Sequence, residues 1–492
     1  MISWVESLPE SVTKSKLRDA ELSDEQINAI CAVIDEKSIE IQALVFQLFH
    51  SLLVPQIVNK AWLFLEAWLL KKPIDEEQLQ SIEQKLTDTL DPSSIVGATW
   101  DWAQGNPDTC EYYYYRLRVL RVLARNSPSH AITVLLSFHI NPHAPWSDEI
   151  NSRIVNVKVD TSFDEFYPTL KPHLLKQLPQ QTRLQGGLTP RLGYGGVKSE
   201  ILQQDVLVNW KKSHLNSLSM VYFTIINYKE NWIVASSFLL NLFDDHEPEF
   251  KIQALHLLQL FLKENPTALE RSGLNVKFIE AVKVCLSYIP NSTPAETSVR
   301  ILSLAYPCMF QLLPPDSTKE LIQFLNSSIL SPISTMSNRY KSDYPLLVLC
   351  IDQMTTMVTT YLSTKILVSF TRVNLALNQL LTNSFIVDSA EGLNVYRACL
   401  RCQQAIIDEF VSLEDQDGRE LFLNYKYDLL GAWIVLAQRL ERNEVADENL
   451  TSQLKSNFYS LKKLTDLDSI LLQIYEKTPQ VQATLAMYLE SK

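Results

Sequence analysis

The stretch 236–312 constrains the fold most, because two apolar helical patterns flank an acidic break at Asp244–Pro248. Apolar residues after the break recur at the three- and four-residue spacing of one helix face: Ile252, Leu255, Leu258 and Leu262. Asp244 or Asp245 is placed to cap the second helix, and Pro248 suits its first turn. The pattern then stops and restarts at two further polar breaks. Helix, tight turn and helix, with wide apolar faces, predicts stacked helix pairs.

Glycine usage supports an all-α fold. The chain has only 11 glycines in 492 residues, and five of them lie in 186–196. The rest of the chain is therefore poor in the residue that tight sheet turns and phosphate-binding loops use. Equivalent turns in 231–315 recur at roughly forty residues per helix pair, which is the range of HEAT-type repeats. We therefore predict an all-α, HEAT-like α-solenoid of stacked antiparallel helix pairs.

The composition is that of a globular protein with an acidic surplus. Hydrophobic residues make up 46% of the chain, charged residues 20%, and the formal net charge is −12. Because an acidic chain repels phosphate groups, we expect neither nucleic acid nor an anionic membrane as a main partner. The seven cysteines, an odd number, fall mostly on apolar patterns and predict buried thiols in a reducing compartment. A signal-peptide layout and a membrane-length apolar run are both missing, so we expect a cytoplasmic and nuclear protein.

The glycine-rich segment divides the chain. It predicts three parts: an N-terminal helical region (1–178), a loop or linker (179–200) and a HEAT-like repeat region (201–492). Neither a P-loop nor a dinucleotide fingerprint fits the glycines, because Val197 stands where a P-loop needs glycine before Lys-Ser. The alternating residues 154–159 are compatible with a short strand or an extended edge.

Three other patterns have a chemical interpretation and a plainer one. Cys399 and Cys402 have zinc-knuckle spacing, but they lie in a helical pattern without a second ligand pair. His139 and His143 lack the helix and the glutamate of a metalloprotease motif. The acids of 244–247 are explained by a helix start, or by a partner contact that uses the same residues. We therefore predict no metal, no cofactor and no catalytic residue.

The N-terminal region has one basic stripe and one broad apolar face. Tyrosines 112–115 precede a row of arginines: Arg116, Arg118, Arg121 and Arg125. This row is interpreted as a solvated stripe or one paired with acidic neighbours, and the alternative is a nucleic-acid face. The aromatic and leucine face of 62–69 is wide enough for burial between two neighbours. Ser23 and Gln26 form a predicted capping box.

Several short motifs in the opening stretch recur together in one known family. In order they are Asp244-Asp245, Lys251, Arg271-Ser272-Gly273-Leu274, Phe278, Leu286, Ile289-Pro290, Thr293-Pro294 and Ala305-Tyr306-Pro307. The order and spacing resemble the family of the second Tel-Two-interacting protein, the smaller interacting subunit of the Triple-T (TTT) co-chaperone complex. The resemblance covers roughly eighty residues, which is more specific than any single motif.

The resemblance implies a function as well as a fold. It implies a non-enzymatic scaffold that binds the large HEAT-repeat subunit and the Tel-Two subunit of the TTT complex. It further implies support for phosphatidylinositol-kinase-related protein kinases, together with the ninety-kilodalton heat-shock chaperone. The candidate partner-binding residues are the signature residues Asp244, Asp245, Lys251, Arg271, Gly273, Leu274, Tyr306 and Pro307. The alternative function is a HEAT-repeat transport or regulatory-subunit adaptor that binds a folded cargo.

Overall fold

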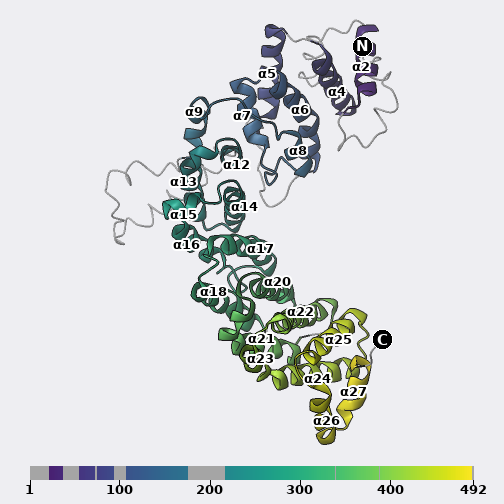
Figure 1. Ribbon diagram of the computed structural model, residues 1–492. Helices are drawn as coiled ribbons and strands as arrows, with labels where there is room; N and C mark the ends of the chain where they lie inside the picture. The colour runs from purple at the N-terminus through teal and green to yellow at the C-terminus, as the bar shows by residue number, and fades with distance from the viewer. Residues whose placement is uncertain are drawn as a thin grey trace, which may run out of the picture. The chain divides into compact units, whose positions relative to one another are not determined.

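The computed structural model describes residues 22–36, 55–72, 75–92, 107–174, 216–337, 340–386 and 388–489 (Figure 1). The chain divides into two compact units, Met1–Leu269 and Glu270–Lys492, called unit 1 and unit 2 below. The predicted linker 179–200 lies outside the described residues, so the three-part division predicted from the sequence stays a prediction.

Unit 1 is built from helices that pack in succession. α4 lies between α2 and α6, and α12 packs against α7, α9 and α14. The helices are α2 (Asp24–Glu36), α4 (Pro55–Lys71), α5 (Glu76–Leu90), α6 (Pro107–Asn126), α7 (His130–His139), α8 (Glu149–Ile154), α9 (Phe163–Leu174), α12 (Ser217–Asn227), η4 (Lys229–Asn231), α13 (Trp232–Phe243) and α14 (Pro248–Glu264). A short helix, α15 (Ala268–Ser272), follows at the division between the units.

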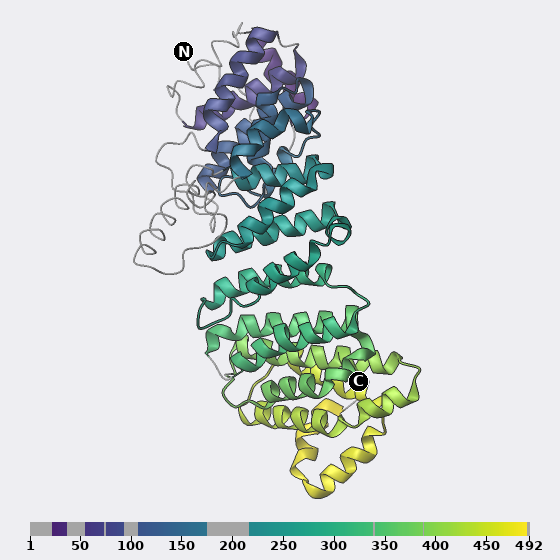
Figure 2. The same ribbon diagram turned by 90° about the vertical axis from the view of Figure 1, so that its left-hand side faces the viewer.

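Unit 2 continues the helical arrangement in two layers. One layer runs through α17, α20, α22 and α25, each packed on the next, and the other contains α21 and α24 (Figures 1 and 2). Its elements are α16 (Asn275–Cys285), α17 (Ala295–Leu312), α18 (Thr318–Phe324), η5 (Leu325–Leu330), α19 (Ser331–Met336), η6 (Lys341–Asp343), α20 (Tyr344–Thr356), η7 (Met357–Leu362), η8 (Ser363–Ser369), α21 (Phe370–Thr382), α22 (Ala390–Ser412), α23 (Gln416–Leu423), α24 (Lys426–Arg442), α25 (Glu448–Lys462), α26 (Leu467–Lys477) and α27 (Gln480–Leu489).

The local sequence signals explain how the first helices form. At the start of α2 the Ser23 Oγ accepts from the Gln26 amide at 3.3 Å, and the Gln26 Oε1 accepts from the Ser23 amide at 2.9 Å. This is the predicted capping box, in which two orphan amides are satisfied reciprocally. The broad apolar face of 62–69 is buried between α2 and α6, as predicted.

The described residues form an all-α solenoid of helix pairs and contain no strand. Residues 149–154 are helical and 156–162 have no regular structure, so the possible strand at 154–159 does not form. The alternating pattern fails because Asp148 caps α8 and starts a helix that takes up the first residue of the pattern. All seven cysteines are buried and unbridged, as predicted.

One run in unit 2 is long and apolar enough to cross a membrane by length and composition, Lys341–Thr382, with a mean hydropathy of 1.2 in its best window. Of that window, 44% is buried inside the unit. Leu346, Leu347 and Ile351 are fully buried, and their helix α20 lies against α17 and α22. Within this run, α20 therefore packs as a core helix of unit 2.

Candidate partner-binding site

The acidic turn Asp244–Pro248 joins α13 to α14. Asp244 ends α13, and Glu247 rather than either aspartate occupies the N-cap of α14. The buried Asp245 accepts the Glu247 amide at 2.9 Å through its Oδ1. The prediction that Asp244 or Asp245 caps α14 is therefore wrong in position. Pro248 has no N–H and starts the helix, so the aspartate ahead of it stabilises the turn before the helix instead.

Lys251 lies in the first turns of α14 with only a few per cent of its surface exposed. Its Nζ donates to the carbonyl of Phe243, the last residue of α13. The last carbonyls of a helix have no partner inside the helix. A cation beside them is also attracted to the negative end of the helix dipole. Lys251 therefore holds the α13–α14 pair together and is not available on the surface.

Arg271–Leu274 span the end of the short helix α15 and the turn that precedes α16. Gly273 has a φ of +71°, in the left-handed region, and its amide donates to the Glu270 carbonyl at 3.1 Å. Nothing lies near the position that a side chain would take, so the conformation and not the space requires glycine. Arg271 is exposed, while Leu274 is half-buried. Of the residues in this turn, Arg271 is the one that presents a charge to a partner.

Tyr306 and Pro307 lie in the middle of α17. Tyr306 is fully buried, and its hydroxyl donates to the Ser328 carbonyl of η5 at 2.7 Å. Burial raises its pKa well above the ordinary range of a tyrosine. Pro307 is half-buried and lacks the N–H that would continue the helix ladder. Both residues shape the packing of α17. Neither presents an exposed side chain for a partner protein to contact.

The signature residues thus separate into two kinds. Three signature residues have buried side chains that bond to backbone groups. Asp245 does so within its own turn, and Lys251 and Tyr306 reach neighbouring elements. Asp244 and Arg271 are exposed, each beside its turn. Because the acidic turn belongs to unit 1 and α17 to unit 2, the structure describes them as separate local sites.

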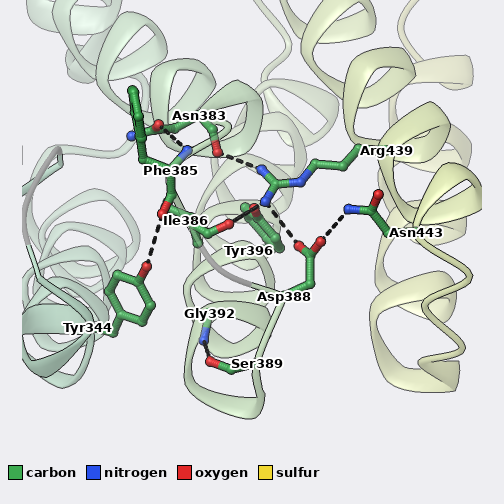
Figure 3. Close-up of polar contacts among 10 residues, drawn as sticks. All are labelled: Tyr344, Asn383, Phe385, Ile386, Asp388, Ser389, Gly392, Tyr396, Arg439 and Asn443. Carbon is green, nitrogen blue, oxygen red and sulfur yellow. Dashed lines mark hydrogen bonds and ion pairs between the residues drawn. The ribbon is translucent and has the colours of Figure 1, made fainter.

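A polar cluster that the sequence does not reveal holds the loop between α21 and α22 (Figure 3). Arg439 reaches from α24 and donates to the carbonyls of Asn383, at 2.5 Å, and Ile386. Its guanidinium also forms an ion pair with Asp388 at 3.1 Å. Asn443 donates to the same carboxylate at 2.5 Å. One arginine therefore satisfies several polar groups of this loop.

This loop presents an exposed aromatic side chain, Phe385. Its ring is 76% exposed, although its backbone carbonyl accepts from the Tyr344 hydroxyl at 3.5 Å and its amide donates to the Asn383 side chain at 2.9 Å (Figure 3). A second aromatic residue, Tyr340, is 79% exposed just before η6. The two segments are neighbours in unit 2, because Asn383 Nδ2 donates to the Ser337 carbonyl at 2.7 Å. We call Tyr340 and Phe385 the aromatic edge.

Several titratable groups of the described residues are deeply buried, and burial shifts their pKa values. No group of three His, Cys, Asp or Glu in this part of the chain is placed to hold a metal ion. Burial raises the pKa of Cys350 and of Cys402 to about 12, so both thiols stay protonated at neutral pH. Burial lowers the pKa of His139 to about 4, and its Nε2 lies 2.7 Å from the Leu90 carbonyl. These groups are fixed in the core.

The predicted basic stripe of α6 turns out to be largely interior. Arg118 is 2% exposed and forms an ion pair with Glu66 of α4 at 2.6 Å, and Arg121 approaches the same carboxylate at 3.5 Å. Arg116 is buried against Trp62 and Tyr112. Of the two interpretations, pairing with an acidic neighbour is confirmed for Arg118 and Arg121. Buried guanidiniums cannot bind a phosphate backbone, so the nucleic-acid alternative fails for Arg116 and Arg118, and only Arg125 of the row is exposed.

Comparison with known proteins places part of the chain in a family. The family model described as the Tti2 family matches residues 132–388, about half of the chain. No curated protein and no solved structure matches the chain. The matched span contains the acidic turn, α17 and the aromatic edge.

Proposed function

The chain belongs to the Tti2 family, whose members are subunits of the TTT complex, and from that premise we propose that it acts as a non-enzymatic scaffold within that complex. The observation that carries the proposal is the family match over 132–388, a span that is helical throughout most of its described length. Stacked helix pairs offer extended surfaces for binding other proteins, which is what a scaffold subunit needs.

The proposal extends to the cellular role. The chain binds the large HEAT-repeat subunit and the Tel-Two subunit, and the assembled complex supports the maturation and stability of phosphatidylinositol-kinase-related protein kinases with the ninety-kilodalton heat-shock chaperone. Such a subunit acts in the cytoplasm and the nucleus.

Within this function, the aromatic edge is the part of unit 2 best suited to contact a partner subunit. Aromatic residues are enriched in protein interfaces and often dominate the binding energy. The backbone that carries Phe385 is fixed by Arg439 and Tyr344, so little conformational entropy is lost when the ring is buried. Both rings lie in the matched span, so the edge belongs to the part of the chain that resembles the family.

Co-purification tests the proposal. The full chain, tagged and expressed with the two proposed subunits, is expected to recover both of them at physiological salt. Recovery of neither subunit at low salt contradicts the proposal, and a small GTPase or a phosphatase as the main partner would favour the adaptor alternative.

Substitution of the aromatic edge then tests the surface. Phe385→Ala with Tyr340→Ala is expected to weaken binding of the large subunit by roughly thirtyfold or more, the effect of losing about 2 kcal/mol at a hot spot. Tyr459→Ala is the matched control, because this ring is also exposed but lies on α25, outside the matched span. Equal affinities for the edge variant and the control show that the partner binds elsewhere.

A further inference from the structure

A groove lies at the C-terminal end of unit 2, outside the span that resembles the family. It is formed by the end of α24, the loop to α25, the start of α25 and one face of α27, and its volume is about 800 Å³. The residues of α27 that line it follow helical spacing: Ala483, Thr484, Met487 and Tyr488. We call it the terminal groove.

The floor of the terminal groove is apolar and contains several small side chains. Leu440, Val445 and Tyr488 contribute apolar surface, and alanines leave room beside them. Met487 is 53% exposed although it points from a helix that otherwise packs on α24 and α25. A flexible, exposed methionine at the edge of an apolar groove is typical of surfaces that adapt to an incoming apolar side chain.

The rim of the groove carries more acidic side chains than its neighbouring cations neutralise. Glu441, Glu444, Asp447 and Glu448 line it, and no lysine, arginine or histidine does. Asp447 is neutralised by Arg397 and also caps α25. The remaining three glutamates form no ion pair with the described residues, and the Glu441 carboxylate accepts only from the Thr484 hydroxyl, at 2.6 Å. A positively charged occupant would therefore be attracted to these glutamates, which no cation of the described residues neutralises.

We propose that the terminal groove binds a basic amphipathic helix of a partner protein. One or two leucine-like side chains of that helix enter the apolar floor beside Met487, and its lysines or arginines meet Glu444 and Glu448. Helix-in-groove recognition works in this way, with apolar anchors at three- and four-residue spacing. The volume of about 800 Å³ is within the usual range of ligand pockets, which is room for one or two such side chains.

The proposal goes beyond TTT membership and does not depend on it, so the two can fail separately. The probe is a fluorescent 15-residue peptide with leucines at i, i+3, i+4 and i+7 and lysines elsewhere, titrated into the full chain. A second peptide keeps the leucines and replaces every lysine by glutamate. A third has the composition of the first in an order without an apolar face.

Two groove variants and two matched controls complete the experiment. Glu444→Lys with Glu448→Lys reverses the rim, and Glu414→Lys with Glu420→Lys makes the same change in net charge on exposed residues away from the groove. Met487→Asp places a charge on the floor, and Leu472→Asp does so on an exposed apolar residue of α26. All four are surface changes, so the fold is expected to persist.

The expected result is binding of the first peptide only, weakened about tenfold or more by each groove variant and less than threefold by each control. A benzophenone group in place of one leucine is expected to cross-link the peptide to α27. Equal losses in the groove and control variants mean nonspecific attraction to an acidic protein and overturn the proposal. Tight binding of the glutamate peptide, or cross-links confined to other helices, also overturns it.

Discussion

The ion pair between Arg118 and Glu66 makes a sharp prediction about unit 1. Glu66 is 1% exposed and Arg118 is 2% exposed, and the Nε–Oε2 distance is 2.6 Å. Replacing Arg118 leaves the buried Glu66 carboxylate with only the longer contact to Arg121, at 3.5 Å. Arg118→Met keeps a long, flexible chain of similar reach, so it removes the charge with little change of volume.

The size of the effect follows from the burial of both groups. Removing one partner of a buried pair typically costs about 3–5 kcal/mol, whereas replacing both by apolar residues is often close to neutral. We therefore expect Arg118→Met to destabilise the contact of α4 with α6 by about 3–5 kcal/mol. Glu66→Leu with Arg118→Met is expected to restore most of this loss, because Arg121 is 12% exposed and can turn its charge to solvent.

Hydrogen exchange measured by mass spectrometry reports the loss of stability helix by helix. A local measurement is needed because a chain with two units need not unfold in a single transition. Amides of α4 and α6 are expected to exchange between about a hundredfold and a few thousandfold faster in Arg118→Met, since each 1.4 kcal/mol is tenfold. Amides of α22 in unit 2 serve as the internal reference. Unchanged protection in the single variant refutes the reasoning, as does a double variant that exchanges as fast as the single one.

Three further substitutions test the core. The pKa of His139 is about 4 in the fold and about 6.5 when unfolded, so the unfolded chain binds the extra proton and unit 1 loses up to roughly 3 kcal/mol between pH 6.5 and 4. His139→Gln is expected to flatten that part of the urea-midpoint profile against pH, and an unchanged profile contradicts it. Tyr306→Phe leaves the Ser328 carbonyl without its donor and is expected to cost about 1–3 kcal/mol in urea unfolding; a neutral result means that water replaces the bond. Leu258→Asp buries an unpaired charge and is expected to abolish cooperative unfolding of unit 1. Ile233→Asp, at an exposed site, is expected to leave cooperative unfolding intact. Similar melting curves for the two variants would contradict the burial of this face.

Local signals in the sequence predict the helices well. The capping box at Ser23 and Gln26 is present as predicted, because both partners of the interaction lie within one turn. The apolar face of α14 is buried at Leu255 and Leu258 because a three- and four-residue spacing fixes which side chains share a face. The capping role of the aspartates is predicted less well. A shift of one residue in the turn changes which backbone amide a carboxylate can reach.

The contacts that hold separate helices together are not visible in the sequence. Glu66 and Arg118 are 52 residues apart, and Arg439 is 56 residues from the Asn383 carbonyl that it binds. Neither pair has a characteristic separation in the sequence, because the packing of the helices determines which side chains meet. An arginine row such as that of α6 is therefore compatible with a surface or an interior position until the neighbouring helix is known.

The same distinction applies to the family signature. Lys251 and Tyr306 are conspicuous in the sequence, yet each is buried and satisfies a backbone carbonyl of a neighbouring element. A buried side chain influences a partner only through the fold that it stabilises, whereas an exposed ring such as Phe385 is itself removed from water on binding. Substituting Lys251 is therefore expected to lower stability and binding together, and substituting Phe385 to lower binding alone. Motifs that identify this family thus need not mark its interface, which has to be sought among exposed side chains on rigid loops.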